Sequence, residues 1–138
     1  MTGRVRRALV WVSVPLALAA CSQRWCTLIG CARTGVIVTI DGFPTGPPVR
    51  VQACLDSTCV DRGVDAVPGT VGIDIPETPR PHEAVVWVRI TQDRSVLLDT
   101  ATRVTLEELA PNGEACGPIC WSADLTATPG GLRQTSAP

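Results

Sequence analysis

The chain has 138 residues, with 12 basic and 13 acidic side chains and a net charge of −1 at pH 7. Three of the arginines lie within the first seven residues, so the remainder carries 9 basic against 13 acidic groups, a net charge of −4. A nucleic-acid-binding domain needs a basic stripe that displaces counterions from phosphates, so this balance argues against that class. The 118 residues after the N-terminal apolar segment suffice for one domain with a modest core.

The first 20 residues have the composition of an export signal. Three arginines within positions 4–7 precede an apolar segment over residues 8–20. This segment is shorter than the ~20 apolar residues that a membrane-spanning helix needs, contains Pro15 and ends in small residues. We therefore predict a secretory signal peptide over residues 1–20. The Arg6-Arg7 pair leaves open whether export follows the general or the twin-arginine route.

The signal ends in Leu18-Ala19-Ala20-Cys21, which resembles the lipobox of bacterial lipoproteins, and the N-terminus is similar to that of an actinobacterial-type envelope lipoprotein. The resemblance implies that the thiol of Cys21 is alkylated with diacylglycerol and that the signal is cleaved before it. The acyl chains would then hold the protein at the extracytoplasmic face of the cell membrane, with residues 21–33 as a lipidated tether. The alternative is an ordinary secretory signal followed by an unmodified Cys21.

Seven cysteines are an odd number for an exported protein. Assigning Cys21 to the lipid leaves an even number, which predicts three disulfides in an oxidising compartment. These bonds would support a core that is poor in aromatic side chains. Six cysteines allow 15 pairings. The six are Cys26, Cys31, Cys54, Cys59, Cys116 and Cys120.

One of these bonds follows from local sequence. If Asp56-Ser57 forms a two-residue turn, Cys54 lies opposite Cys59 at a non-hydrogen-bonded position, where Cα atoms are ~4.5 Å apart. A disulfide can close that distance, and it would lie on the outer face of the hairpin. A metal site is the alternative, but it needs further ligands and His82 is the only histidine.

Short stretches of alternating apolar and polar residues are separated by glycine, proline and aspartate along the rest of the chain. A period of two predicts β-strands, and seven or so such stretches predict an all-β fold, a single small disulfide-braced β-sandwich over residues 34–128. We predict strands near residues 36–40, 49–54, 71–75, 84–90, 95–99, 102–106 and 119–125.

Three further segments carry predictions about structure. Leu109-Ala110-Pro111, ahead of a strand that bears cysteine, resembles the Leu-x-Pro corner of fibronectin type III domains and implies an immunoglobulin- or fibronectin III-like sandwich. Residues 107–113 are expected to form one helical turn that ends at Asn-Gly. Residues 129–138 are rich in glycine, serine and proline, which predicts a disordered tail.

Two aromatic residues are candidate binding residues. Trp87 lies out of phase with the apolar row Val86, Val88 and Ile90, so it faces outward if that row is the core. It would then be available to stack on a sugar ring or a protein partner, but the high average burial of tryptophan favours a place in the core. Phe43 lies in a Gly-Phe-Pro loop, and loop tips often carry binding function.

We predict no catalytic, metal or cofactor site. His82 is the only imidazole, lies in a proline-rich loop and has no free cysteine to activate, which favours a surface histidine. Cys116 and Cys120 have three intervening residues and precede a strand, unlike redox-active pairs at a helix start, so a structural bond is favoured. The aspartates in the turns match no calcium-binding loop.

We therefore expect a non-enzymatic, membrane-anchored binding or interaction module whose partner is an envelope polymer or an envelope protein. A structural accessory subunit of an envelope complex is the second possibility, and a small secreted hydrolase or inhibitor is the third. An exposed Trp87 would favour binding, and a polar cleft at His82 with a carboxylate in reach would favour an enzyme. A flat apolar patch would favour the accessory role.

Overall fold

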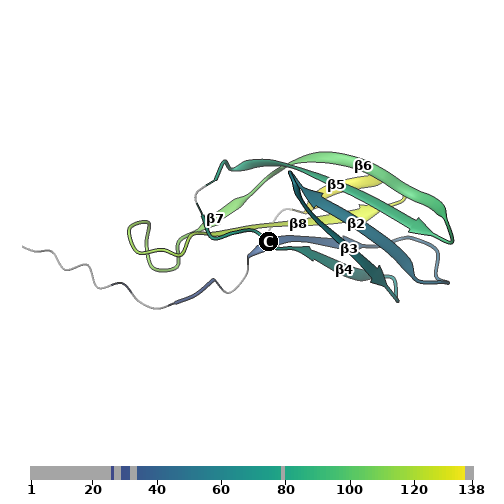
Figure 1. The fold of residues 1–138 in the computed structure, drawn as a ribbon, viewed down its shortest axis with the longest axis horizontal. Helices are drawn as coiled ribbons and strands as arrows, with labels where there is room; N and C mark the ends of the chain where they lie inside the picture. The colour runs from purple at the N-terminus through teal and green to yellow at the C-terminus, as the bar shows by residue number, and fades with distance from the viewer. Residues whose placement is uncertain (1–25, 27–28, 32–33, 79, 136–138) are drawn as a thin grey trace, which may run out of the picture.

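The computed structural model describes residues 26, 29–31, 34–78 and 80–135. Within them the chain forms nine β-strands in two sheets that lie face to face, and three disulfides (Figure 1). The all-β, sandwich-like, disulfide-braced fold is thus confirmed. In this described part of the chain, no helix has the length and hydropathy to cross a membrane. The predicted signal peptide and Cys21 lie outside the described residues.

The first sheet contains β4, β1 and β8 in that order, and both β7 and β9 pair with the other edge of β8. Strand β1 runs antiparallel to β4 and parallel to β8. Strand β7 pairs with residues 120–122 of β8 and β9 with residues 124–128, so the two short strands follow each other along one edge. The bounds are β1 Gly35–Ile40, β4 Gly69–Ile73, β7 Glu107–Leu109, β8 Cys120–Thr128 and β9 Gly131–Thr135.

The second sheet has the order β3-β2-β5-β6, and its neighbouring strands are all antiparallel. In the immunoglobulin order the first two strands are neighbours in one sheet, whereas β1 and β2 lie in opposite sheets here. The strand order of the described residues differs from this immunoglobulin order, so the immunoglobulin- or fibronectin III-like form of the sandwich is not confirmed. The bounds are β2 Val49–Leu55, β3 Thr58–Val64, β5 Glu83–Gln92 and β6 Ser95–Thr105.

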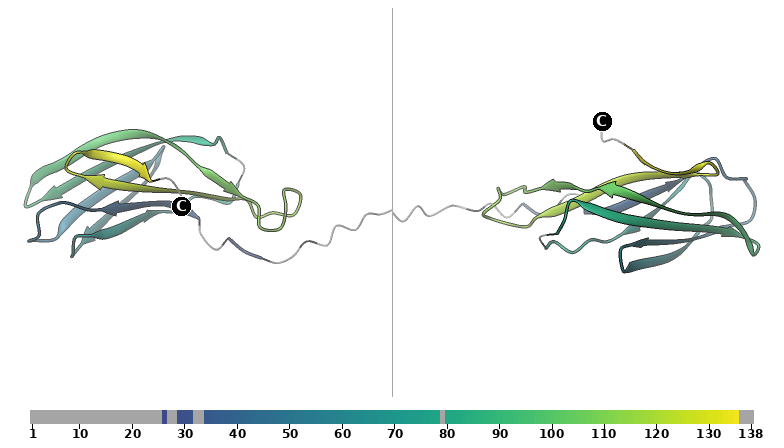
Figure 2. Two further views of the ribbon diagram at one scale, coloured as in Figure 1. Left: turned by 180° about the vertical axis from the view of Figure 1, so that it is seen from behind. Right: turned by 90° about the horizontal axis from the view of Figure 1, so that it is seen from above.

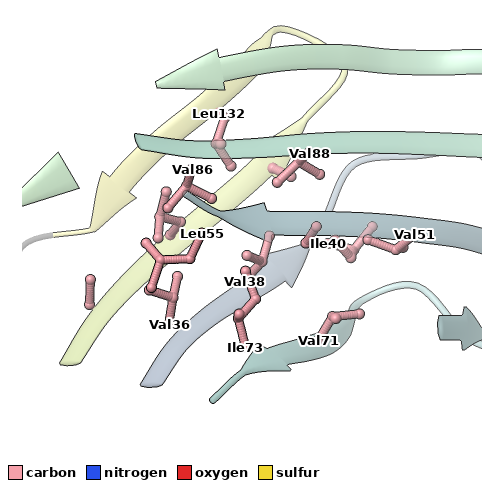
Figure 3. Close-up of a cluster of buried hydrophobic side chains, with 14 of the residues drawn as sticks. Val36, Val38, Ile40, Val51, Leu55, Val71, Ile73, Val86, Val88 and Leu132 are labelled. Atoms are coloured by element: carbon pink, nitrogen blue, oxygen red, sulfur yellow. The ribbon is translucent and has the colours of Figure 1, made fainter. Parts of the chain in front are cut away.

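The core lies between the sheets and consists of the apolar residues at alternate strand positions (Figure 3). In β1 and β5 the buried positions are those predicted from the period of two, including Val38 and Val88. Each large side chain buried in this way stabilises the fold by about 1.5–3 kcal/mol. Trp121 of β8 is fully buried, and its indole N–H donates a hydrogen bond to the Thr78 carbonyl at 2.9 Å.

Two predicted segments differ in the structure because β8 offers an open edge. Residues 107–109, expected in a helical turn, form β7 and pair with β8. Residues 131–135, expected in a disordered tail, form β9 through a two-residue Pro129-Gly130 turn that pairs Thr128 with Gly131. Burial of Leu132 adds an apolar anchor to this hairpin. Backbone pairing along the β8 edge outweighs the local turn and tail signals.

One of the three disulfides closes a hairpin, and the other two attach the N-terminal segment to the sandwich. Cys54 and Cys59 are directly opposed in the β2–β3 hairpin with Cα atoms 4.0 Å apart, which confirms the predicted bond. Cys26 is bonded to Cys116, and Cys31 to Cys120. These two bonds, which the sequence left open, attach the segment before β1 to the loop that leads into β8 and to the first residue of β8.

The two long-range bonds should reinforce each other in a measurable way. They join residues separated by 90 and 89 positions. Once one bond is closed, the other closes a ring of only roughly 11 residues, because the two bonds interleave and join residues 26–31 to residues 116–120. We expect that replacing either pair with alanines lowers the free energy of unfolding by roughly 3 kcal/mol, and replacing both pairs by roughly 7 kcal/mol. Urea unfolding of the soluble form spanning residues 22–138 measures this; a double loss equal to the sum of the single losses would contradict it.

Candidate functional site

Trp87 lies on the outer face of the second sheet, between Cys54 of β2 and Ala101 of β6. Its neighbours Val86 and Val88 are fully buried, so the alternation of β5 directs the indole away from the core. The expectation that Trp87 is a core residue is wrong. The small side chain of Ala101 leaves room for the indole beside it, and Trp87 is partly exposed.

Asp99 of β6 holds the indole in place. The Trp87 Nε1–H donates a hydrogen bond to Asp99 Oδ1 at 2.8 Å, so the ring extends from β5 toward β6. Arg89 lies directly opposite Asp99, and its Nε is 3.5 Å from the other carboxylate oxygen. One carboxylate therefore positions an aromatic ring and a guanidinium group next to each other.

A second polar cluster borders the same face on the β3 side. Arg50 binds Asp61 through two hydrogen bonds of 2.8 and 2.9 Å, and Gln52 donates a third to Asp61 at 3.1 Å. The hydrogen bonds from Arg50 and then from Gln52 hold the pKa of the Asp61 carboxyl below its usual value. The Asp61 carboxylate in turn raises the pKa of Arg50. The cluster is exposed, so it contributes little to stability.

We call the outer surface formed by Gln52, Cys54, Trp87, Arg89 and Asp99 the Trp87 face. It offers an aromatic ring surrounded by a carboxamide, a guanidinium group and a carboxylate, which together supply donors and acceptors for a polar ligand. At its end near the β2–β3 turn lies a shallow cavity of about 190 Å³, lined by Asp56, Glu83, Ala84, Val85 and Arg103.

Phe43, the other predicted contact residue, does not face solvent. Its side chain is only 5% exposed and belongs to the core cluster. The loop turns back at Gly42, which has a φ of +72° and whose N–H donates a hydrogen bond to the Asp41 side chain. This turn directs the ring under the loop, where burial of an aromatic side chain is favourable. Phe43 therefore supports the loop and is not a binding residue.

His82 has the surface position that we predicted, with its side chain 62% exposed. Its Nε2 lies 3.4 Å from a Glu108 carboxylate oxygen, and its ring packs edge-on against Trp121 with centroids 5.1 Å apart. None of the hydrogen bonds among the described residues joins the imidazole to a hydroxyl or thiol. Within the same residues, no group of three or more His, Cys, Asp or Glu side chains is arranged to hold a metal ion. His82 thus covers one side of the core tryptophan.

A second surface, which the sequence reasoning missed, lies at the end of the molecule where the N-terminal segment is attached. Ile29 is 55% exposed and Leu109 is 48% exposed. The available sequence signal for this surface was the pair of cysteines on either side of Ile29, but the sequence did not show which cysteines they are bonded to. The two side chains border an apolar cavity of about 230 Å³ whose lining is Ile29, Gly30, Cys31, Leu109, Ala110, Pro111 and Cys120.

Replacing Asp99 tests whether this carboxylate holds the Trp87 indole. In Asp99→Ala the indole N–H loses its acceptor and Arg89 loses its partner, so we expect unfolding to require about 1 kcal/mol less free energy. We also expect faster hydrogen exchange of the indole N–H, measured by NMR. The matched control Asp99→Asn retains an oxygen acceptor and should keep the slow exchange. Unchanged exchange in Asp99→Ala would show that the hydrogen bond does not position the ring.

Comparisons with protein-family models, curated proteins and solved structures find no match to this chain. The chemistry of its surfaces is therefore the basis for a functional proposal. Two surfaces stand out among the described residues, the Trp87 face on the side of the second sheet and the apolar end at Ile29 and Leu109.

Proposed function

We propose that this protein is a lipid-anchored binding module of the bacterial cell envelope, and that the Trp87 face binds a hydroxyl-rich envelope polymer. The observation that carries the proposal is the partly exposed indole of Trp87, held by Asp99 beside Arg89 on an open sheet face. The electron-rich face of an indole attracts the C–H groups of a sugar ring. The neighbouring carboxylate, guanidinium and carboxamide groups supply hydrogen bonds to hydroxyls.

The charge distribution favours a polymer over a protein partner at this face. The centre of a protein–protein interface is largely apolar and depleted of most charged residues, aspartate among them, although tryptophan and arginine are enriched there. Here Arg89 and Asp99 lie immediately beside the aromatic ring, and Arg50 with Asp61 borders it. Covering these charges with an apolar partner would leave them without water, at a high cost in free energy. A hydrated polymer with many hydroxyl groups avoids that cost.

The proposal includes no catalytic step. Acyl or glycosyl hydrolysis needs a nucleophile or a pair of carboxylates placed around the scissile bond. His82 has a carboxylate partner in Glu108, but its imidazole packs against Trp121 and its hydrogen-bond geometry involves no hydroxyl or thiol among the described residues. The three disulfides occupy all six described cysteines.

The lipid anchor is tested at Cys21. In Cys21→Ala the thiol that receives the lipid is absent, so we expect the protein to leave the membrane fraction and appear in the soluble fraction after cell disruption. Each buried methylene of the acyl chains contributes ~0.8 kcal/mol, so the chains together would supply most of the affinity for the membrane. Replacement of both Cys54 and Cys59 with alanine serves as a control that removes two cysteines but retains the anchor. Cys21→Ala protein that still sediments with membranes after a high-salt wash would show the anchor proposal to be wrong.

The binding face is tested by retention of the soluble form on isolated cell wall. We expect the protein to be retained, and Trp87→Ala to weaken the affinity about tenfold or more, as aromatic anchors contribute at least about 1.4 kcal/mol. Trp87→Phe keeps an aromatic ring and should bind more tightly than Trp87→Ala. Arg133→Ala, on an exposed position of β9 in the other sheet, should have no effect.

Two results of this experiment would contradict the proposal. Equal retention of Trp87→Ala and the unchanged protein would place the binding site elsewhere. Capture of a single solubilised membrane protein, with no retention on wall polymer, would instead identify an accessory subunit of an envelope complex.

A further inference from the structure

We infer that the apolar end of the molecule, formed by residues 29–31 and 109–111, rests directly on the lipid bilayer and orients the domain. The inference builds on the proposed lipidation of Cys21, which by itself would leave the domain free to tumble at the membrane. It assigns the surface at Ile29 and Leu109 to one partner, the boundary between headgroups and acyl chains.

The apolar end has the chemistry of a lipid-contacting surface. Ile29 and Leu109, two of the four large apolar side chains that are exposed in the described part of the chain, lie together here. The cavity between them is lined by glycine, alanine, proline and the cysteines of the Cys31–Cys120 bond, so no charged side chain lines it. An exposed apolar surface of this kind marks a contact site with a membrane or a partner.

The surface is also rigid. The Asn112 side chain accepts a hydrogen bond from the Ile29 N–H at 3.2 Å and donates to the Ile29 carbonyl at 2.8 Å. The same carboxamide donates to the Gly117 carbonyl at 2.8 Å. With a disulfide on each side of Ile29, at Cys26 and Cys31, the segment is held from three points. The conformational entropy of this segment is therefore lost when the protein folds, and little more is lost when the surface contacts lipid.

The position of the anchor brings this end, and no other, to the membrane. Cys26 is only five residues from Cys21 and is bonded to Cys116. Five residues of fully extended chain span at most about 18 Å, which limits how far the proposed lipid can be from Cys26. Residues 29–31 and the loop between β7 and β8 lie at one end of the sandwich, and the β5–β6 turn lies at the other end (Figures 1 and 2). Strand β6 has eleven residues, so the far end is roughly 35 Å away.

The charges near the surface specify how it would bind. The described residues 26, 29–31 and 106–120 include three glutamates and no arginine. Arg24 and Arg33 lie close to this end in the sequence and offset part of that negative charge. No cluster of basic residues among the described residues attracts anionic lipids, so the contact rests on the apolar side chains. A contact of this kind is insensitive to salt and forms on a zwitterionic bilayer, because screening affects only the electrostatic part of binding.

Tryptophan introduced at matched positions tests the contact in the lipidated protein. Leu109→Trp lies at the apolar end, and Val96→Trp lies at the far end of β6, where Val96 has the same 48% exposure. The protein is inserted into phosphatidylcholine vesicles whose acyl chains are brominated near the headgroup. Such a surface enters the bilayer to a depth of about 5–10 Å. We therefore expect the fluorescence of the tryptophan introduced at position 109 to fall about twofold or more, and that of the tryptophan at position 96 to stay unchanged.

Flotation of the same vesicles separates this inference from the anchor proposal. Protein that floats while positions 109 and 96 are quenched equally would overturn the contact but keep the anchor. Protein that fails to float would overturn both. Quenching that requires anionic lipid or disappears at high salt would overturn the apolar contact. Ile29→Trp provides a second probe from the other side of the surface, and near-ultraviolet circular dichroism verifies that each variant is folded.

Discussion

The structure depends on one constraint of the β-strand, namely that neighbouring residues point to opposite faces. In β5 this constraint buries Ala84, Val86, Val88 and Ile90 and turns Trp87 outward. A shift of one residue would bury Trp87 together with the charge of Arg89 and expose the whole apolar row. Burial of a row of branched side chains outweighs burial of one indole, so the position of Trp87 follows from its neighbours rather than from its own hydrophobicity.

The sequence predicted features that depend on neighbouring residues. The Cys54–Cys59 bond followed from a two-residue turn, because the turn alone sets which residues are opposed. The strands followed from the period of two. That period does not say which strands are neighbours, so the position of β1 between β4 and β8 could not be predicted. The Cys26–Cys116 and Cys31–Cys120 bonds depend on that order, and for this reason they remained open.

The incorrect predictions share a physical cause, since backbone pairing or burial in the core outweighed each local turn signal. The Pro129-Gly130 stretch indicated a flexible tail, yet β8 supplied an edge and the core accepted Leu132. Phe43 lay in a loop of turn-forming residues, but the turn at Gly42 returned its ring to the core. The Trp87 site depends on Asp99, which is far from Trp87 along the chain and reaches it only through the β5–β6 register.

The two proposed surfaces are compatible because they lie on different sides of the molecule. The strands of the second sheet run from the apolar end toward the far turns, so a domain that stands on the apolar end directs the Trp87 face sideways. Trp87 is four residues from the start of β5, roughly 14 Å along the strand from the end of the sheet on the side of the apolar end. A polymer lying parallel to the bilayer can reach that height, and hydrogen bonds from Arg89 and Gln52 along the sheet extend the contact beyond one sugar ring. A short tether is sufficient for this arrangement, because the ligand approaches the side of the domain and the domain does not have to leave the membrane to bind it.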